Sequence, residues 1–157
     1  MKRILVLLAI ASVVTAVSVS AAQAAVVVND RTSVGYAGFV PCADGGAGEI
    51  LSGAIDVHNL VTSSVNGNNV SWRFQFQPQG GSMVGAITGD TYRVTGVSHG
   101  GSHESLDGDH YTLTYVNAFQ LIGPGPGNNL RVHETAHLTI NGDEVVVQHD
   151  NLTIDCT

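Results

Sequence analysis

The residues with the most direct chemical meaning are His133, Glu134 and His137, which form the string H-E-T-A-H. On a helix, two histidines at this spacing lie one turn apart on one face and can bind the zinc ion of a metalloprotease. In a strand the same spacing is roughly 13 Å, at about 3.3 Å per residue. Imidazoles so far apart cannot share a zinc ion whose Zn–N bonds are about 2 Å long. The secondary structure of this stretch therefore decides whether a zinc site can exist.

Residues 130–140 alternate between apolar and polar side chains, which is the pattern of a strand. The apolar Val132 and Leu138 share one parity, and His133 and His137 fall on the other. The residues 141–143 that follow, Asn-Gly-Asp, are typical of a tight hairpin turn before a partner strand. We therefore predict a β-hairpin, and we predict no metal site in it.

Glu134 has the parity of the apolar residues in this strand, so we expect its side chain to face inward. Aliphatic surroundings disfavour a charged carboxylate. In the mouth of a ligand cavity such a group could act as a general acid or base, or hold a polar group of a ligand. The alternative is a structural pair with an arginine or tyrosine, or a bulge that turns the side chain outward. Glu134 is the single candidate for a catalytic residue.

Residues 99–110 hold the densest cluster of histidines and carboxylates in the chain. Imidazole and carboxylate groups together suit zinc or another transition metal. The stretch is also polar and rich in glycine, so we expect a solvated loop. It contains no complete calcium-binding pattern. A cross-strand metal pair of His133 or His137 with His149 or His58 is a separate alternative that the sequence leaves open. We predict no bound metal and no cofactor.

Residues 1–24 have the features of a secretory signal peptide. Lys2 and Arg3 precede an apolar core, and Ala22-Gln23-Ala24 is a small-x-small cleavage site. An uncleaved membrane anchor is the alternative, because the apolar run is long enough to span a bilayer. With cleavage, residues 25–157 form a single domain that is secreted or periplasmic and has no stable membrane association.

The two cysteines, Cys42 and Cys156, both lie in the exported part of the chain. An even number of cysteines in an oxidising compartment predicts a disulfide. Because it would enclose most of the domain, the chain-entropy model assigns it about 4–5 kcal/mol of stabilisation. This pairing also removes both cysteines as candidate nucleophiles.

The charge of the exported chain is strongly negative. It has no lysine and only four arginines against the 13 acidic residues of the sequence. Loss of Lys2 and Arg3 with the signal peptide takes the formal net charge from −7 to −9. We infer from this balance that the protein offers no basic face to nucleic acid or to anionic lipid.

Alternating segments separated by turn residues predict about eight antiparallel strands and no helix after the signal peptide. The expected strands cover residues 34–40, 49–65, 70–77, 82–88, 91–98 and 110–122, with two more in the final hairpin. An all-β fold follows, as a sandwich or as a closed barrel. We favour the barrel, because closure removes sheet edges that a lysine-free chain does not protect. A barrel of eight strands can hold one small ligand.

Aromatic residues recur on the predicted inward faces and are the expected ligand contacts. Together with Glu134, the predicted ligand-binding residues are Trp72, Phe74, Phe76, Tyr111 and Tyr115. Because no complete catalytic motif accompanies them, the leading hypothesis is non-catalytic binding of a small apolar ligand or of a partner surface. A barrel enzyme of the isomerase or cyclase kind, with Glu134 as acid or base, is the alternative. A metal-dependent hydrolase that uses the histidines is the third.

Several stretches resemble a group of small exported bacterial proteins. They are PCADGGAGE at 41–49, FQFQPQG at 74–80, TGDTYRVTGV at 88–97, and the segments LIGPGPGNN, VHETAHLTINGD and HDNLTIDC between 121 and 156. The resemblance spans most of the mature chain and implies an exported bacterial protein. That group has no assigned activity, so no catalytic residue is carried over, and the choice between barrel and sandwich stays open.

Overall fold

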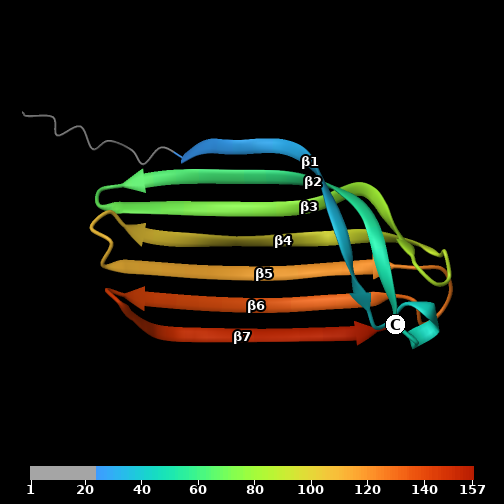
Figure 1. Cartoon of the computed structure of the whole chain (residues 1–157). Coiled ribbons are helices and arrows are strands. Elements are labelled where there is room, and N and C mark those ends of the chain that lie inside the picture. Colours follow the sequence, from blue (N-terminus) through green and yellow to red (C-terminus); the bar gives the residue numbers. More distant parts are fainter. Residues whose placement is uncertain (1–23) are drawn as a thin grey trace, which may run out of the picture.

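The computed structural model describes residues 24–157, so the predicted signal peptide lies outside the described residues except for Ala24. These residues form one seven-stranded antiparallel sheet in which each strand pairs with the next along the chain (Figure 1). The strands are β1 (Ala24–Val40), β2 (Glu49–Asn66), β3 (Asn69–Gly85), β4 (Thr91–Ser105), β5 (His110–Ile122), β6 (Leu130–Asn141) and β7 (Glu144–Cys156). A short 3-10 turn, η1 (Asp44–Gly46), joins β1 to β2. The all-β antiparallel prediction is confirmed.

Two of the predicted hairpin turns depend on glycine. Gly67 between β2 and β3 has φ of 58°, and Gly142 between β6 and β7 has φ of 56°. Glycine reaches this left-handed region without the steric cost that a Cβ would bring. Because β6 and β7 flank Gly142 as an antiparallel pair, with one register shift between Thr139 and Ile140, the predicted final hairpin is confirmed.

The sheet has seven strands rather than about eight because β3 runs through Pro78. Pro78 pairs with Val57 of β2, and a bulge at the next residue shifts the register. On its other side β3 is unpaired with β4 between Phe76 and Met83. A proline has no backbone donor and is tolerated at a bulge or an unpaired edge. The two segments predicted as separate strands, 70–77 and 82–88, therefore belong largely to one long strand.

Residues 99–105 were expected to be loop and instead complete β4. The glycines that indicated a loop serve close packing. A Cβ built on Gly100 would lie 2.6 Å from the tip of the Phe74 ring, and one on Gly101 would lie 2.9 Å from the carbonyl oxygen of Trp72. Glycine in a strand commonly marks such close approaches. The loop prediction for this stretch was wrong for that reason.

The closed barrel predicted from the sequence is also wrong, because β1 and β7 are the two edges of an open sheet. In Figure 1, the second half of β1 and the first half of β2, which pair with each other, bend across the ends of the other strands toward the C-terminus. The chain is closed there by a disulfide. Cys42, just after β1, is bonded to Cys156, the last residue of β7, with 5.3 Å between their Cα atoms. The disulfide prediction is confirmed. The first and last strands are thus linked by one covalent bond at one end, and not by the ladder of hydrogen bonds that a closed barrel would have between them.

The hydrophobic core gathers at the end of the sheet that carries the disulfide, which we call the stapled end. Its buried apolar residues are Val40, Cys42, Ala43, Leu51, Met83, Tyr92, Leu121, Leu130 and Val132. They come from the strand ends nearest to η1 and to the loop 123–129. The opposite end of the sheet, the open end, is formed by the hairpin tips at residues 66–69, 105–110 and 141–144. Every residue of β7 is exposed.

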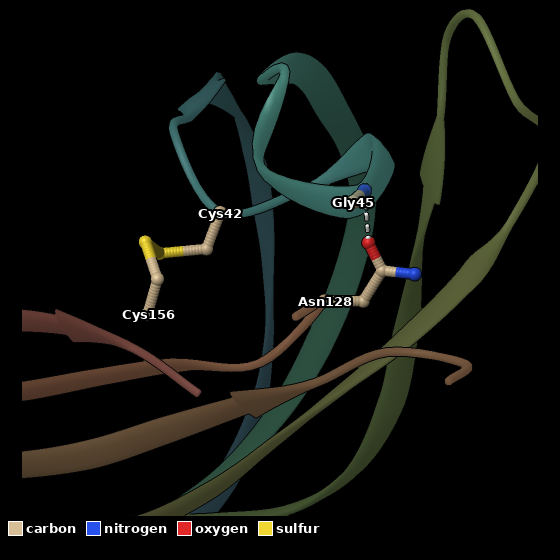
Figure 2. Close-up of a disulfide and its surroundings, with 4 residues drawn as sticks. All are labelled: Cys42, Gly45, Asn128 and Cys156. Carbon is tan, nitrogen blue, oxygen red and sulfur yellow. Dashed lines mark hydrogen bonds between the residues drawn. A yellow bond between two sulfur atoms is a disulfide. The ribbon is translucent and has the colours of Figure 1, made fainter. Parts of the chain in front are cut away.

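Asn128 connects the β5–β6 loop to the turn after the disulfide. Figure 2 shows its side chain beside η1, where its Oδ1 accepts a hydrogen bond from the backbone N–H of Gly45 at 2.6 Å. Its Nδ2 donates to the carbonyl oxygen of Pro124. The buried amide thus has partners on both sides, as buried polar groups require. It fixes a glycine- and proline-rich loop against the stapled end.

Candidate functional site

A cavity of about 830 Å³ opens beside the core and is the best-formed candidate site. Its walls come from both edges of the sheet, with Val34 and Tyr36 on β1 and Leu152 and Ile154 on β7. Most of the remaining lining is aliphatic or aromatic, and it includes Tyr115. Small-molecule sites are typically apolar hollows of about 300–1,000 Å³ with a few polar groups that orient the ligand. We call the sheet face that lines this cavity the inner face.

Three polar residues form a row across the inner face. Ser98 of β4 is the cross-strand partner of Asn117 of β5, and Asn117 is the partner of Glu134 of β6. Such partners share one face of a sheet. The Ser98 hydroxyl donates to Asn117 Oδ1 at 2.5 Å, and Asn117 Nδ2 donates to Glu134 Oε2 at 3.4 Å. Ser98 and Asn117 both line the cavity, so the row presents hydrogen-bonding groups to its interior.

Glu134 lies on the inner face together with Val132, as its parity predicts. The β5–β6 register is regular through this position, so no bulge turns the side chain outward. Its half-buried carboxylate accepts a hydrogen bond from Asn117 and not from the arginine or tyrosine considered above. It stands next to the cavity-lining residues and is not one of them. The geometry gives Glu134 a role in orienting Asn117, and its role as acid or base stays a prediction.

The predicted aromatic residues share the inner face but extend beyond the cavity. Phe74 packs against Phe76 with ring centroids 5.6 Å apart, and against Tyr115 at 6.3 Å. Phe74 reaches Tyr115 across β4 because Gly100 stands between them in the register. Trp72 pairs with Ser102, and Tyr111 pairs with Glu104. Both pairs lie farther toward the open end than the cavity does. Among the predicted ligand contacts, Tyr115 alone lines the large cavity.

The residues of β1 and β7 that complete the cavity were not predicted from the sequence, and neither were Ser98 and Asn117. Asn117 could have been found, because it has the same parity as Tyr115 and Phe119 in a strand of inward apolar residues. No local sequence pattern indicates that Val34 and Ile154 line the same cavity. They meet because the disulfide lies where the end of β1 and the end of β7 come together at the stapled end.

The H-E-T-A-H string lies within β6, as predicted, so it cannot form the helical zinc site. His133 and His137 face the side opposite to the cavity, which we call the outer face. His137 is the direct cross-strand partner of His149. The Nδ1 atom of His137 lies 3.0 Å from the Thr114 hydroxyl, and its Nε2 atom lies 3.3 Å from the Thr139 hydroxyl.

The polar cluster between residues 99 and 110 is divided by the sheet. His99 and His103 lie on the outer face, Glu104 lies on the inner face, and Asp107 is in the turn, where it accepts a hydrogen bond from Asn68 at 2.7 Å. Within residues 24–157, no group of three histidine, cysteine or acidic side chains is arranged to hold a metal ion.

A buried carboxylate at the stapled end escaped the sequence analysis. Glu49 is almost fully buried, and it accepts hydrogen bonds from the backbone N–H groups of Ile87 and Thr88 at 2.8 and 3.1 Å. The Thr88 hydroxyl donates to it at 2.7 Å. These bonds, the Thr88 hydroxyl foremost, hold the pKa of Glu49 below its usual value against the opposing effect of burial. Since all its bonds serve the β3–β4 turn, we assign Glu49 a structural role.

Comparison with protein-family models, with curated proteins and with solved structures finds no match to this chain. In the described part of the chain, no helix is long and apolar enough to cross a bilayer.

Proposed function

We propose that this protein is an exported binding protein that holds a small apolar ligand in the cavity at the stapled end, without chemical transformation. The observation that carries the proposal is the cavity of about 830 Å³ with mainly apolar walls. Several of its wall residues, such as Leu152 and Ile154, are more than half exposed. An apolar ligand would remove this surface from water, which is favourable by about 25 cal/mol per Å².

The polar row supports selectivity within this function. Ser98 and Asn117 place a hydroxyl and an amide at one wall of an otherwise apolar hollow. We therefore expect a ligand with an apolar body and one hydrogen-bonding group. The disulfide supports an exported location, because such bonds persist in oxidising compartments.

Binding of a neutral apolar dye, N-phenyl-1-naphthylamine, tests the proposal. The dye should fluoresce with the wild-type protein in a saturable manner at one site. Val34→Trp should abolish this signal, because Val34 lines the cavity and is 50% exposed, so a larger side chain can enter the hollow. Val84→Trp is the matched control, since Val84 is 45% exposed on β3 and does not line the cavity. Absence of saturable binding, or equal binding by both variants, would refute the proposal.

The second candidate function is catalysis by Glu134 as general acid or base, as in an isomerase or cyclase. The hydrogen bond between Glu134 and the cavity-lining Asn117 supports it. Glu134→Gln separates the two candidates once a natural ligand is identified from the purified protein. A binding protein should return that ligand unchanged with either side chain, whereas an enzyme should convert it only with the carboxylate present.

A further inference from the structure

The basic residues of the described chain lie on one face of the sheet. All four arginines, Arg31, Arg73, Arg93 and Arg131, occupy strand positions on the outer face, as do all seven histidines. The assignment follows from the register, because directly paired residues share a face and alternate residues of a strand share it too. Although the net charge of the chain is negative, its basic side chains are concentrated on one face of the sheet.

The densest part of this face surrounds a position without a side chain. Arg73 of β3 is paired with Gly101 of β4, and His99 and His103 stand two residues to either side of that glycine. A hollow of about 320 Å³ lies here, and Arg73, His99, Gly101, His103 and Thr114 are among its lining residues. We call it the glycine hollow. A Cβ on Gly101 would lie 3.8 Å from Arg73 Cγ, so the missing side chain leaves space directly beside the arginine.

No carboxylate occupies the neighbouring outer-face positions of the described strands. Arg73 is paired on its other side with Thr62 of β2, and Gly101 with Thr114 of β5. Farther along the same row are His137 of β6 and His149 of β7. Acidic side chains on the outer face lie elsewhere, and one of them, Asp155, is the cross-strand partner of Arg131. Every titratable group that faces the row from β3, β4, β6 and β7 is thus basic.

The donors around the hollow are also partly oriented. The Nδ1 atom of His103 lies 2.7 Å from the Ser71 hydroxyl, which leaves Nε2 free to point elsewhere. Arg31 donates to Gln79 and Arg131 lies beside Gln120, whereas within residues 24–157 the Arg73 guanidinium has no such partner. An exposed guanidinium without a protein partner can give two parallel N–H bonds to a tetrahedral anion.

We propose that the glycine hollow is a binding site for a tetrahedral oxyanion of the phosphate or sulfate class. Arg73 supplies the permanent charge, His99 and His103 supply ring N–H donors from either side of Gly101, and the Thr114 hydroxyl lines the far wall. Histidine gains its charge between about pH 8 and 5. The site should therefore bind an anion more tightly at pH 5.5 than at pH 7.5.

Inorganic sulfate is the appropriate probe, because its charge is constant over this pH range. Titration of the disulfide-bonded protein, followed by the NMR signals of the histidine rings and of the Gly101 amide, should give saturable binding. We expect the dissociation constant to be about tenfold lower at pH 5.5 than at pH 7.5, which corresponds to roughly 1.4 kcal/mol. No saturable shift at pH 5.5 would overturn the proposal.

Arg73→Gln should abolish sulfate binding at both pH values. Arg93→Gln is the matched control, because Arg93 is also exposed on the outer face of β4 but does not line the glycine hollow, and it should bind as the wild type does. The double variant His99→Gln with His103→Gln should keep weak binding and lose its pH dependence. Equal losses in the two arginine variants would show a diffuse charge effect and would overturn the proposal.

Sedimentation with phosphatidic acid vesicles distinguishes the two sources of such an anion. If the wild type sediments with the vesicles and Arg73→Gln does not, the anion is a lipid headgroup. If sulfate binds but the vesicles do not retain the protein, the anion is a soluble one. The proposed apolar ligand site lies on the other face of the sheet, so failure of either proposal leaves the other in place.

Discussion

The stapled end and the open end of the sheet have the same strands and the same alternation of side chains, yet only one of them has a core. At the stapled end, β1 and β2 bend over the other strands, and Leu51 and Tyr92 are fully buried. Toward the open end the sheet is a single layer, and its residues are exposed or half-buried except for the buried Ser102. Because a sheet face is buried only when another element covers it, stability should be concentrated where the strands cross.

The largest effect that tests this difference is removal of the disulfide. The bond closes a loop with a sequence separation of 114 residues, and the chain-entropy model assigns such a loop about 4–5 kcal/mol. Replacement of Cys42 and Cys156 by serine should lower the free energy of unfolding by this amount. The measurement is urea denaturation followed by the fluorescence of Trp72. An unchanged midpoint would mean that strand crossing alone holds the stapled end.

Truncation of one leucine at a time gives the next largest contrast. Leu51→Ala should cost about 2–5 kcal/mol, because Leu51 is 0% exposed in the core and the deletion leaves a cavity. Leu152→Ala should change the unfolding free energy by no more than about 0.5 kcal/mol, because Leu152 is 54% exposed on β7. The same variant should weaken dye binding, since Leu152 lines the cavity. Similar losses of stability in both variants would contradict the concentration of stability at the stapled end.

A smaller, pH-dependent effect should arise from Glu49. Hydrogen bonds, first from the Thr88 hydroxyl, place its pKa below the usual value of 4.5. Because the pKa is lower in the folded protein than in the unfolded chain, this stabilisation is complete above pH 4.5 and is lost as the pH falls through the folded value. The unfolding free energy of the wild type should therefore decrease below pH 4.5.

Two substitutions isolate this contribution. Glu49→Gln removes the titrating group, and Thr88→Val keeps the carboxylate but removes the hydroxyl that donates to it. Both variants should show a weaker decrease of the unfolding free energy on acidification than the wild type. A slope equal to that of the wild type in Glu49→Gln would assign the acid sensitivity to other carboxylates.

The two faces of the sheet show which features a local sequence pattern can predict. The parity rule correctly assigned Glu134 to the inner face and His133 and His137 to the outer face, because a strand places alternate side chains on opposite sides whatever its surroundings. The same rule excluded the zinc site. Composition says less about the faces, because charge sums do not record which face a residue occupies.

The strand boundaries predicted from glycine and proline were wrong for a related reason. Gly100 and Gly101 indicated a loop, and Pro78 indicated the end of a strand, because these residues interrupt isolated elements. In the folded chain, Gly100 and Gly101 leave space for the side chains of Phe74 and Arg73. Pro78 lies where β3 has no partner strand on one side. Such tolerance depends on neighbouring strands, which a single stretch of sequence does not specify.

Local sequence patterns account for the antiparallel strands, the inward and outward sides of most of them, the glycine turns and the presence of two cysteines able to pair. These properties follow from local alternation and from the conformations open to each residue type. The open sheet, the cavity between β1 and β7, and the glycine surrounded by Arg73 and two histidines are visible in the folded chain alone. Those features depend on the bending of whole strands and on the register between them, through contacts between residues far apart in the chain.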